Sequence, residues 1–204
     1  MKKSGAPAEK TMIMSRILAA LLLCFATTAA SAAPAQTQGP QRDATYTADE
    51  VVQKGSEFFG VTTETMAKAL ERVFAKYGEP DAYIAGSEGS GAFIVGLRYG
   101  EGELYMKQSP TPMKVYWQGP SVGFDYGANA SKVFTLVYNL RSPDKIYTRF
   151  PGIEGSAYLV AGLGVNYQQS GRTILAPIRS GVGLRAGIGA GYLSYSRERS
   201  WLPF

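Results

Sequence analysis

The sequence of 204 residues contains no histidine and a single cysteine, Cys24. Histidine is the commonest general base in enzymes and the commonest ligand of protein-bound metals. One cysteine cannot form an intramolecular disulfide or a zinc–cysteine site. We therefore expect a protein that binds no cofactor and no metal and that is not an enzyme.

The N-terminal segment has the pattern of a cleaved secretory signal peptide. Its positive charges come from Lys2, Lys3, Lys10 and Arg16. An uncharged stretch, Ile17–Ala30, follows, and Ala30-Ser31-Ala32 supplies the small residues that a signal peptidase recognises. The stretch is too short to cross a bilayer as a helix. A lipoprotein signal at Cys24 is disfavoured because Leu23 before it is not small. We predict that residues 1–32 are removed and that the mature chain works in the periplasm.

The mature chain has little net charge. Of the 21 basic and 16 acidic residues, 17 and 15 lie after residue 32. No run of basic residues remains among them, so we expect no nucleic-acid partner.

Two helices are predicted near the start of the mature chain, after a disordered leader at residues 33–45. Thr47 and Glu50 form a capping box, and Gly60 can end the first helix in the left-handed conformation. The second helix is predicted from Thr63 to Tyr77, with its apolar residues on one face. The two helices are expected to form a hairpin that lies on a sheet. A membrane-surface pair is the alternative, but their polar faces carry both signs of charge.

From Pro80 onward the hydrophobic period changes from helical spacing to two. Strands are predicted at residues 91–99, 103–108, 113–117, 132–138, 157–167, 172–178 and 182–194. The turns between them are expected at residues 100–102, 109–112, 142–144 and 170–171. This pattern predicts a β-sandwich or small barrel within a single domain, residues 46–204.

Glycines alternate with apolar residues along the last predicted strand. Between Gly181 and Gly191 the glycines occupy one face, which only Arg185 interrupts. The segment 159–165 shows the same alternation of glycine and apolar residues. A glycine face indicates the close approach of a helix, strong barrel curvature or a ligand lying on the backbone. Packing and ligand contact both stay open as explanations.

Two segments contain residues that catalytic sites use, but the chemistry around them is incomplete. Gly119–Gly123 fits the G-x-S-x-G nucleophile elbow, but a serine nucleophile of that kind needs a histidine. Glu101 and Glu103 are a close acidic pair that a hydrolase could use, yet they fall at a predicted turn, where solvated carboxylates are usual. Neither segment makes an active site.

The segment from Gly91 to Asn139 resembles the SYLF lipid-binding family distantly. The likeness lies in Arg-Tyr-Gly-Glu-Gly at residues 98–102 and in Gly-Ala-Asn-Ala-Ser at residues 127–131. Over nearly the whole mature length, including the paired helices and the ending at Ser196, the sequence more closely resembles the envelope integrity protein EipA family of Gram-negative bacteria. This resemblance implies an α+β fold that is mainly β: a small antiparallel β-barrel with a packed N-terminal helical pair. It also implies a role in maintaining the cell envelope without an assigned reaction.

We therefore predict a non-enzymatic periplasmic protein that binds an apolar or lipid-like component of the envelope beneath the outer membrane. Arg98 and Arg185 are candidate ligand-binding residues because each interrupts an apolar or glycine face and needs an acid or a polar head group. Tyr99, Tyr105 and Trp117 are the aromatic candidates. Peripheral contact with a membrane stays open. The alternative function is an adaptor that docks peptidoglycan or lipopolysaccharide machinery.

Overall fold

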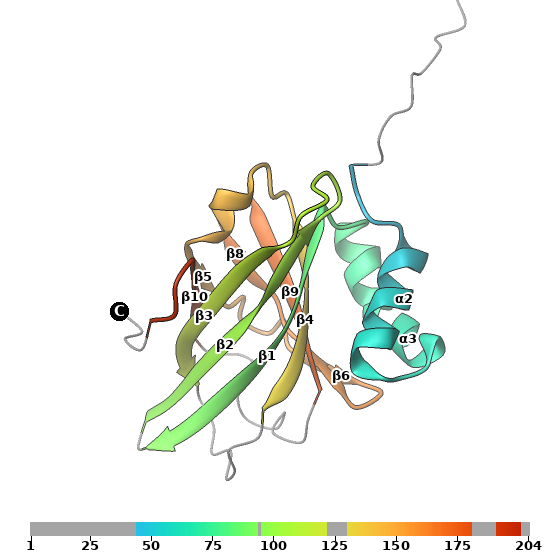
Figure 1. Cartoon of the computed structure of the whole chain (residues 1–204). Helices are drawn as coiled ribbons and strands as arrows, with labels where there is room; N and C mark the ends of the chain where they lie inside the picture. The colour runs from blue at the N-terminus through green and yellow to red at the C-terminus, as the bar shows by residue number, and fades with distance from the viewer. Residues whose placement is uncertain (1–43, 94, 122–129, 181–190, 201–204) are drawn as a thin grey trace, which may run out of the picture. The chain divides into compact units, whose positions relative to one another are not determined.

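The computed structural model describes residues 44–93, 95–121, 130–180 and 191–200. They belong to one compact unit that extends from Gln41 to Phe204. Two helices come first, α2 (Ala48–Phe59) and α3 (Thr63–Tyr77), and ten strands follow (Figure 1). The strands are β1 (Ala82–Phe93), β2 (Val95–Met106), β3 (Met113–Ser121), β4 (Ser131–Tyr138), β5 (Arg149–Pro151), β6 (Tyr158–Val160), β7 (Leu163–Val165), β8 (Gln168–Ser170), β9 (Thr173–Ser180) and β10 (Tyr192–Ser196), with a 3₁₀ helix, η1 (Pro143–Ile146), before β5.

Both helices begin and end where the sequence predicts. The Thr47 side chain accepts a hydrogen bond from the Glu50 amide, and the Glu50 carboxylate accepts one from the Thr47 amide at 2.9 Å. Gly60 ends α2 with a φ of 73°, in the left-handed region. Gly55 of α2 faces the Met66 side chain of α3, where an added Cβ would collide with the thioether. The helices therefore approach closely at this glycine and form the expected hairpin.

All strand pairs are antiparallel and form one curled sheet. The order along the sheet is β5-β10-β3-β2-β1-β4-β9-β7-β6, and β8 also pairs with β9. Near β5, Gly152 forms a bridge with Gln168 of β8, and the Ile153 amide donates to the Tyr167 carbonyl at 2.9 Å. The β5 end of the sheet thus meets β8, the strand that branches from β9, and the curled sheet confirms the predicted fold of a small antiparallel β-barrel with a packed helical pair.

Alternate residues of the central strands belong to two separate hydrophobic cores, one on each face of the sheet. In β4, Phe134, Leu136 and Tyr138 face the helices, whereas Val133 and Val137 point into the barrel. The core between helices and sheet also contains Val51, Met66, Ala69, Leu70, Val73, Tyr83, Ala176 and Ile178. The core inside the barrel also contains Ile84, Leu104, Val115, Trp117, Phe150, Leu175, Leu193 and Tyr195. The helices therefore cover the sheet, and the barrel has a packed interior of its own.

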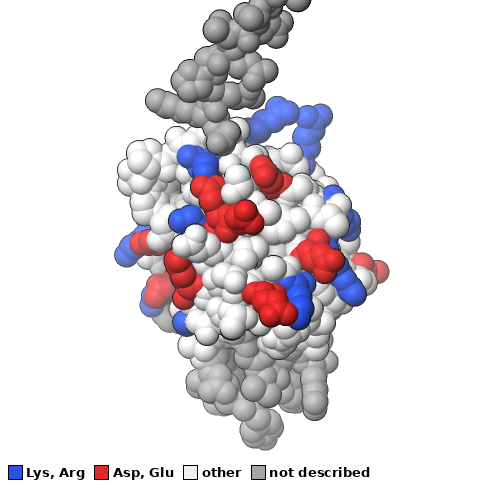
Figure 2. Space-filling model, turned by 90° about the vertical axis from the view of Figure 1, so that its right-hand side faces the viewer, with Lys and Arg blue, Asp and Glu red and all other residues white. Residues whose placement is uncertain are grey.

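The face that carries the helices shows acidic and basic side chains interspersed (Figure 2). Glu64 pairs with Lys68 on α3, and Glu50 of α2 pairs with Lys107. Among the described residues, none of the helices is long and apolar enough to span a membrane.

Four sequence predictions about strands need correction or restriction. The predicted strand 91–99 is not one strand, because residues 91–93 end β1 and pair with residues 95–97 at the start of β2. Gly100-Glu101-Gly102 is not a turn but the middle of β2, paired with residues 86–88 of β1. Residues 157–167 are not one strand but the hairpin of β6 and β7, with positive φ angles at Ala161 (51°) and Gly162 (80°). These angles are typical of the tight turn that joins two antiparallel strands. Most of the predicted strand 182–194 lies outside the described residues, which resume at Gly191, just before β10.

Candidate functional site

One row of residues crosses the inner face of the barrel. Glu88 of β1 lies opposite Gly100 of β2, Gly100 lies opposite Trp117 of β3, and Trp117 lies opposite Tyr195 of β10. Directly paired residues share one face of a sheet, so all four positions face the barrel interior. The row brings an acid and two aromatic side chains together from four strands.

The Trp117 indole lies flat over two neighbouring strands because those strands carry glycines there. A Cβ added at Gly100 would overlap the indole, and one added at Gly86 would lie 2.8 Å from its Cη2 atom. The indole is almost fully buried and its Nε1–H donates to the Glu88 carboxylate at 3.1 Å. The glycines in this part of the sheet thus make room for Trp117.

Glu88 is the centre of a buried charged cluster. Arg179 Nε–H of β9 donates to Glu88 Oε1 at 2.6 Å, and Arg98 Nε of β2 lies 3.5 Å from the same oxygen. The Arg179 Nη1–H group also donates to Asn166 Oδ1 at 2.6 Å. The side chains of Glu88, Arg179 and Arg98 are 5%, 8% and 15% exposed. The arrangement is a shared carboxylate between two guanidinium groups.

The electrostatic balance at Glu88 favours the ionised form. Burial raises the pKa of Glu88, but the charges of Arg179 and Arg98 and the hydrogen bonds from Arg179 and Trp117 outweigh burial and hold the pKa below its ordinary value. Burial also raises the pKa of the adjacent Tyr195, which therefore stays a neutral phenol. Glu88 thus acts as a fixed negative charge and not as a proton carrier at neutral pH.

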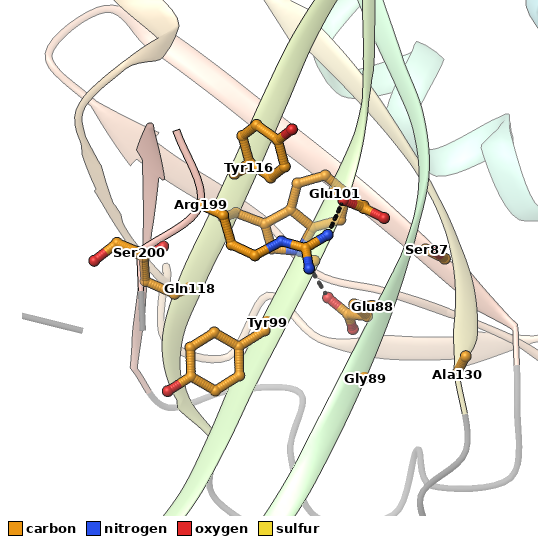
Figure 3. Close-up of a pocket in the computed structure, with 12 residues that line it drawn as sticks. Ser87, Glu88, Gly89, Tyr99, Glu101, Tyr116, Gln118, Ala130, Arg199 and Ser200 are labelled. Carbon is orange, nitrogen blue, oxygen red and sulfur yellow. Dashed lines mark hydrogen bonds and ion pairs between the residues drawn. The ribbon is translucent and has the colours of Figure 1, made fainter. Parts of the chain in front are cut away.

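A cavity of about 390 Å³ lies over β1, β2 and β3 (Figure 3), and the Tyr99, Glu101 and Tyr116 side chains that line it alternate with this row and so lie on the outer face of the sheet. Its lining includes Glu88, Tyr99, Glu101, Tyr116, Trp117 and Arg199. Arg199 reaches across the cavity and donates to the Glu101 carboxylate at 2.5 Å, with its guanidinium 5.9 Å from the centre of the Tyr116 ring. Both members of this ion pair are about half exposed. The cavity is therefore lined by tyrosine side chains and an exposed ion pair on the outer face of the sheet, and by Glu88 and Trp117 from the row on the inner face.

Apolar side chains pack one part of the described barrel interior. Ile84, Leu104, Phe150, Leu175 and Leu193 are each at most 2% exposed and pack against one another. The barrel interior is thus divided into a packed apolar part and a polar part around Glu88.

The structure separates the five predicted ligand-binding residues. Arg98 and Trp117 meet at Glu88, and Tyr99 lines the cavity. Tyr105 lies elsewhere: its ring stacks on Tyr83 at 4.8 Å between centroids, in the core beneath the helices. Arg185 lies outside the described residues. A role of these residues in ligand binding stays a prediction.

Sequence reasoning missed Glu88 and Arg179. Glu88 was hidden within the glycine-rich segment 86–91, and Arg179 follows an apolar strand segment near its end. A charged residue at an inward position of an otherwise apolar strand was the available signal, the same signal that selected Arg98. Its partner could not be identified, because Arg179 and Glu88 are 91 positions apart in the sequence.

Other candidate chemistry has a structural explanation. Glu101 pairs with Arg199, and Glu103 accepts a hydrogen bond from the Tyr105 hydroxyl at 2.6 Å. Gly119, Pro120 and Ser121 belong to β3 and not to a strand-to-helix turn of the kind a nucleophile elbow requires. Within the described ranges, no three acidic, histidine or cysteine side chains converge as a metal site.

Comparison with known proteins supports the fold and gives the family. A crystal structure described as a β-barrel-like, uncharacterized protein from Brucella abortus is 49% identical in sequence, with a TM-score of 0.72; the match covers 78% of this chain and 99% of that one. The comparison with curated proteins found no match. The similarity to the SYLF family stays a prediction. Residues 44–204 match the family of envelope integrity protein A, EipA. Because this match extends over most of the sequence and includes both helices and the barrel, the chain belongs to the EipA envelope integrity family.

Proposed function

We propose that this protein is a non-enzymatic periplasmic component that supports the integrity of the cell envelope by binding a lipid-like envelope molecule in the cavity beside Trp117. The observation that carries the proposal is the aromatic lining of an open cavity on the barrel surface. Tyr99, Tyr116 and Trp117 are its aromatic lining residues, and Arg199 and Glu101 are its charged ones on the outer face. Ligand sites are typically concave and mostly apolar, with a few polar groups that orient the ligand.

The size of the cavity favours partial burial of the ligand. A volume of about 390 Å³ is at the lower end of the range of about 300–1,000 Å³ that is usual for small-molecule sites. Such a cavity holds one end of an amphiphile, while the rest of the molecule lies outside. This mode suits a protein that contacts envelope lipids without enclosing them.

The chemistry of the cavity supports binding over catalysis. Its buried acid is shared by two arginines and stays ionised, which makes it a poor proton donor at neutral pH. Its exposed acid, Glu101, is paired with Arg199. Turnover of a phospholipid or muropeptide by the pure protein, lost in Glu101→Gln, would contradict the proposal.

Gly89 offers a variant that fills the cavity. It lines the cavity, and a Cβ added there would have no heavy atom within 4 Å. Native mass spectrometry of protein purified from the periplasm should show a bound lipid that Gly89→Phe loses. The matched control is Thr111→Phe, which adds the same ring to the exposed connection between β2 and β3.

The outcomes separate binding from docking. Loss of the lipid in Gly89→Phe but not in Thr111→Phe supports the proposal. A protein with no co-purified lipid, and none bound on addition, is not a lipid-binding protein. Crosslinking in intact cells that captures the same protein partner with wild type and Gly89→Phe would instead favour the adaptor function.

A further inference from the structure

A second cavity, also of about 390 Å³, lies at the end of the barrel where β1 and β9 begin and β2 and β4 end. Its lining is mostly polar and consists of Ala44, Asp81, Met106, Gln108, Asn139, Leu140, Arg141 and Arg172. Asp81 and Glu88, which lines the cavity beside Trp117, are seven positions apart along β1, roughly 20 Å in an extended strand. The second cavity is therefore a separate site.

This second cavity brings together two arginines without a partner. Arg141 and Arg172 are exposed, and within the described ranges neither guanidinium group pairs with an acid or lies over an aromatic ring. Every other described arginine has such a partner: Arg98 and Arg179 pair with Glu88, Arg197 with Asp144 and Arg199 with Glu101, and Arg72 and Arg149 lie over the rings of Tyr158 and Tyr192. Both unpaired guanidinium groups thus line the same cavity.

Hydrogen bonds hold the two arginine-bearing segments together. Asn139 has a φ of 59°, in the left-handed region that asparagine tolerates, and its side-chain amide donates to the Arg172 carbonyl at 3.2 Å. The Thr173 hydroxyl donates to the Asn139 carbonyl at 3.4 Å, and the Leu140 amide donates to the Asp81 carboxylate at 2.9 Å. The segment after β4 is therefore fixed against the turn before β9 and against the start of β1.

The chemistry of this lining suits a phosphate group. A single guanidinium group can satisfy both oxygens of a carboxylate, whereas a phosphate has further oxygens for a second guanidinium group. Asp81 offsets one of the two positive charges, so the lining keeps a net positive charge. Gln108 adds a neutral amide donor. The large apolar side chains of the lining are Met106 and Leu140, so the cavity favours a polar group over an acyl chain.

We propose that Arg141 and Arg172 bind a phosphate group, either as free phosphate or as the headgroup of a phospholipid. Both sources present the same oxygens to the guanidinium groups. This site goes beyond the proposed function, because it lies at another end of the barrel from the cavity beside Trp117. The alternative is that the two arginines are solvated surface charges without a ligand.

Two probes distinguish the sources of the phosphate. Calorimetric titration at low ionic strength, where charged contacts are least screened, measures the binding of inorganic phosphate. Vesicle flotation measures binding to phosphatidylcholine vesicles with and without phosphatidic acid, a lipid whose headgroup is a phosphate monoester. The phosphatidylcholine vesicles are the control, because their headgroup carries no net charge.

Substitution of each arginine tests the site. Arg141→Gln and Arg172→Gln should each weaken phosphate binding about tenfold, as expected for the loss of one charge-assisted contact. Arg172→Lys keeps a positive charge and should retain part of the affinity. Arg149→Gln is the matched control, because Arg149 is exposed, lies over the Tyr192 ring and does not line the cavity. Circular dichroism should show that all four variants fold as wild type does.

The outcomes decide both the site and its ligand. Binding that each glutamine variant weakens, and that Arg149→Gln leaves unchanged, supports the site. If phosphatidic acid vesicles bind with this dependence, the ligand is a lipid headgroup; if inorganic phosphate alone does so, it is the free anion. Absence of binding by both probes, or binding that Arg141→Gln and Arg172→Gln do not weaken, overturns the proposal. The lipid test with Gly89→Phe concerns the other cavity, so either proposal can fail without the other.

Discussion

Trp117 lies directly across the strand pair from Gly100, and its indole covers the place that a side chain at residue 100 would take. The same ring extends over Gly86 on the next strand and reaches Glu88 through Nε1. A cluster of glycines in one part of the sheet thus positions a tryptophan and, through it, an acid.

Gly100→Ala should destabilise the protein by about 1–3 kcal/mol, because an added methyl group forces the buried Trp117 ring out of place. The control is Gly89→Ala, where the added Cβ meets no atom within 4 Å. Since alanine restricts the unfolded chain more than glycine does, Gly89→Ala should leave the stability unchanged or slightly raised. Urea unfolding of both variants measures the difference, and equal losses would show that the indole does not require Gly100.

Glu88→Gln should destabilise the protein by about 3–5 kcal/mol at neutral pH, because it leaves two arginines around an uncharged group in the barrel. The effect should depend on pH. The folded-state pKa of Glu88 is lowered, so its stabilisation is fully present above the unfolded value of about 4.3 and is lost as the pH falls through the folded value.

The measurement for Glu88 is the free energy of unfolding of wild type and variant at several pH values. Other carboxylates titrate in both proteins, so the difference between the two curves isolates Glu88. This difference should be largest above about pH 5 and shrink below about pH 4. A difference that stays constant over this range would mean that Glu88 is not ionised in the folded protein.

Thr47→Ala should cost about 1 kcal/mol by removing the side-chain cap of α2, whereas Thr47→Ser retains the hydroxyl and should cost little. Thermal unfolding followed by circular dichroism compares the two. The helices cover the core that contains Phe134 and Tyr83, so the loss should appear in the global transition. If the two variants unfold at the same temperature, the cap does not stabilise the native fold.

Arg199→Ala should change ligand access more than stability. The Arg199–Glu101 pair is about half exposed, and pairs of this kind contribute about 0–1 kcal/mol. Because Arg199 crosses the cavity, its removal should raise the association rate of an amphiphile such as n-octyl phosphate in stopped-flow fluorescence (Figure 3).

Arg197→Ala is a close control for this experiment. Arg197 forms a similarly exposed ion pair, with Asp144, and lies over the Tyr147 ring, away from the cavity. Both variants should unfold within about 1 kcal/mol of wild type. Identical association rates in the two variants would show that Arg199 does not restrict entry.

The helices could be predicted from the sequence because their signals are local. Thr47 and Glu50 are three residues apart, and the glycines that end both helices follow directly. The barrel was harder because strand pairing joins distant residues. Gly100 and Gly102 looked like a turn since glycine is common there. The indole of Trp117 explains Gly100, and the close approach of the β1 backbone at Ala85 and Gly86 explains Gly102.

The candidate site was predictable in part for the same reason. Arg98 and Trp117 could be selected because a buried charge in a strand needs a partner, and a buried indole needs packing space and an acceptor for its N–H group. Their meeting point, Glu88, depends on the register of β1 against β2 and on the curl of the sheet toward β9. Tyr105 lies on the same face of β2 as Tyr99, but the helices cover only its end of the strand, and the sequence does not show how far that cover extends.

The barrel also has a seam. Twelve residues of β1 are paired with twelve of β2, whereas the described residues show one bridge between the end of β5 and β8, from Gly152, the residue after β5, to Gln168. Beside it, the Ser156 hydroxyl accepts a hydrogen bond from the Tyr167 amide at 3.0 Å. Parting the wall there breaks few hydrogen bonds, so amide exchange at Ile153 and Tyr167 should be faster than in the centre of β1. We therefore expect the barrel to open locally along this line while its long strands stay paired.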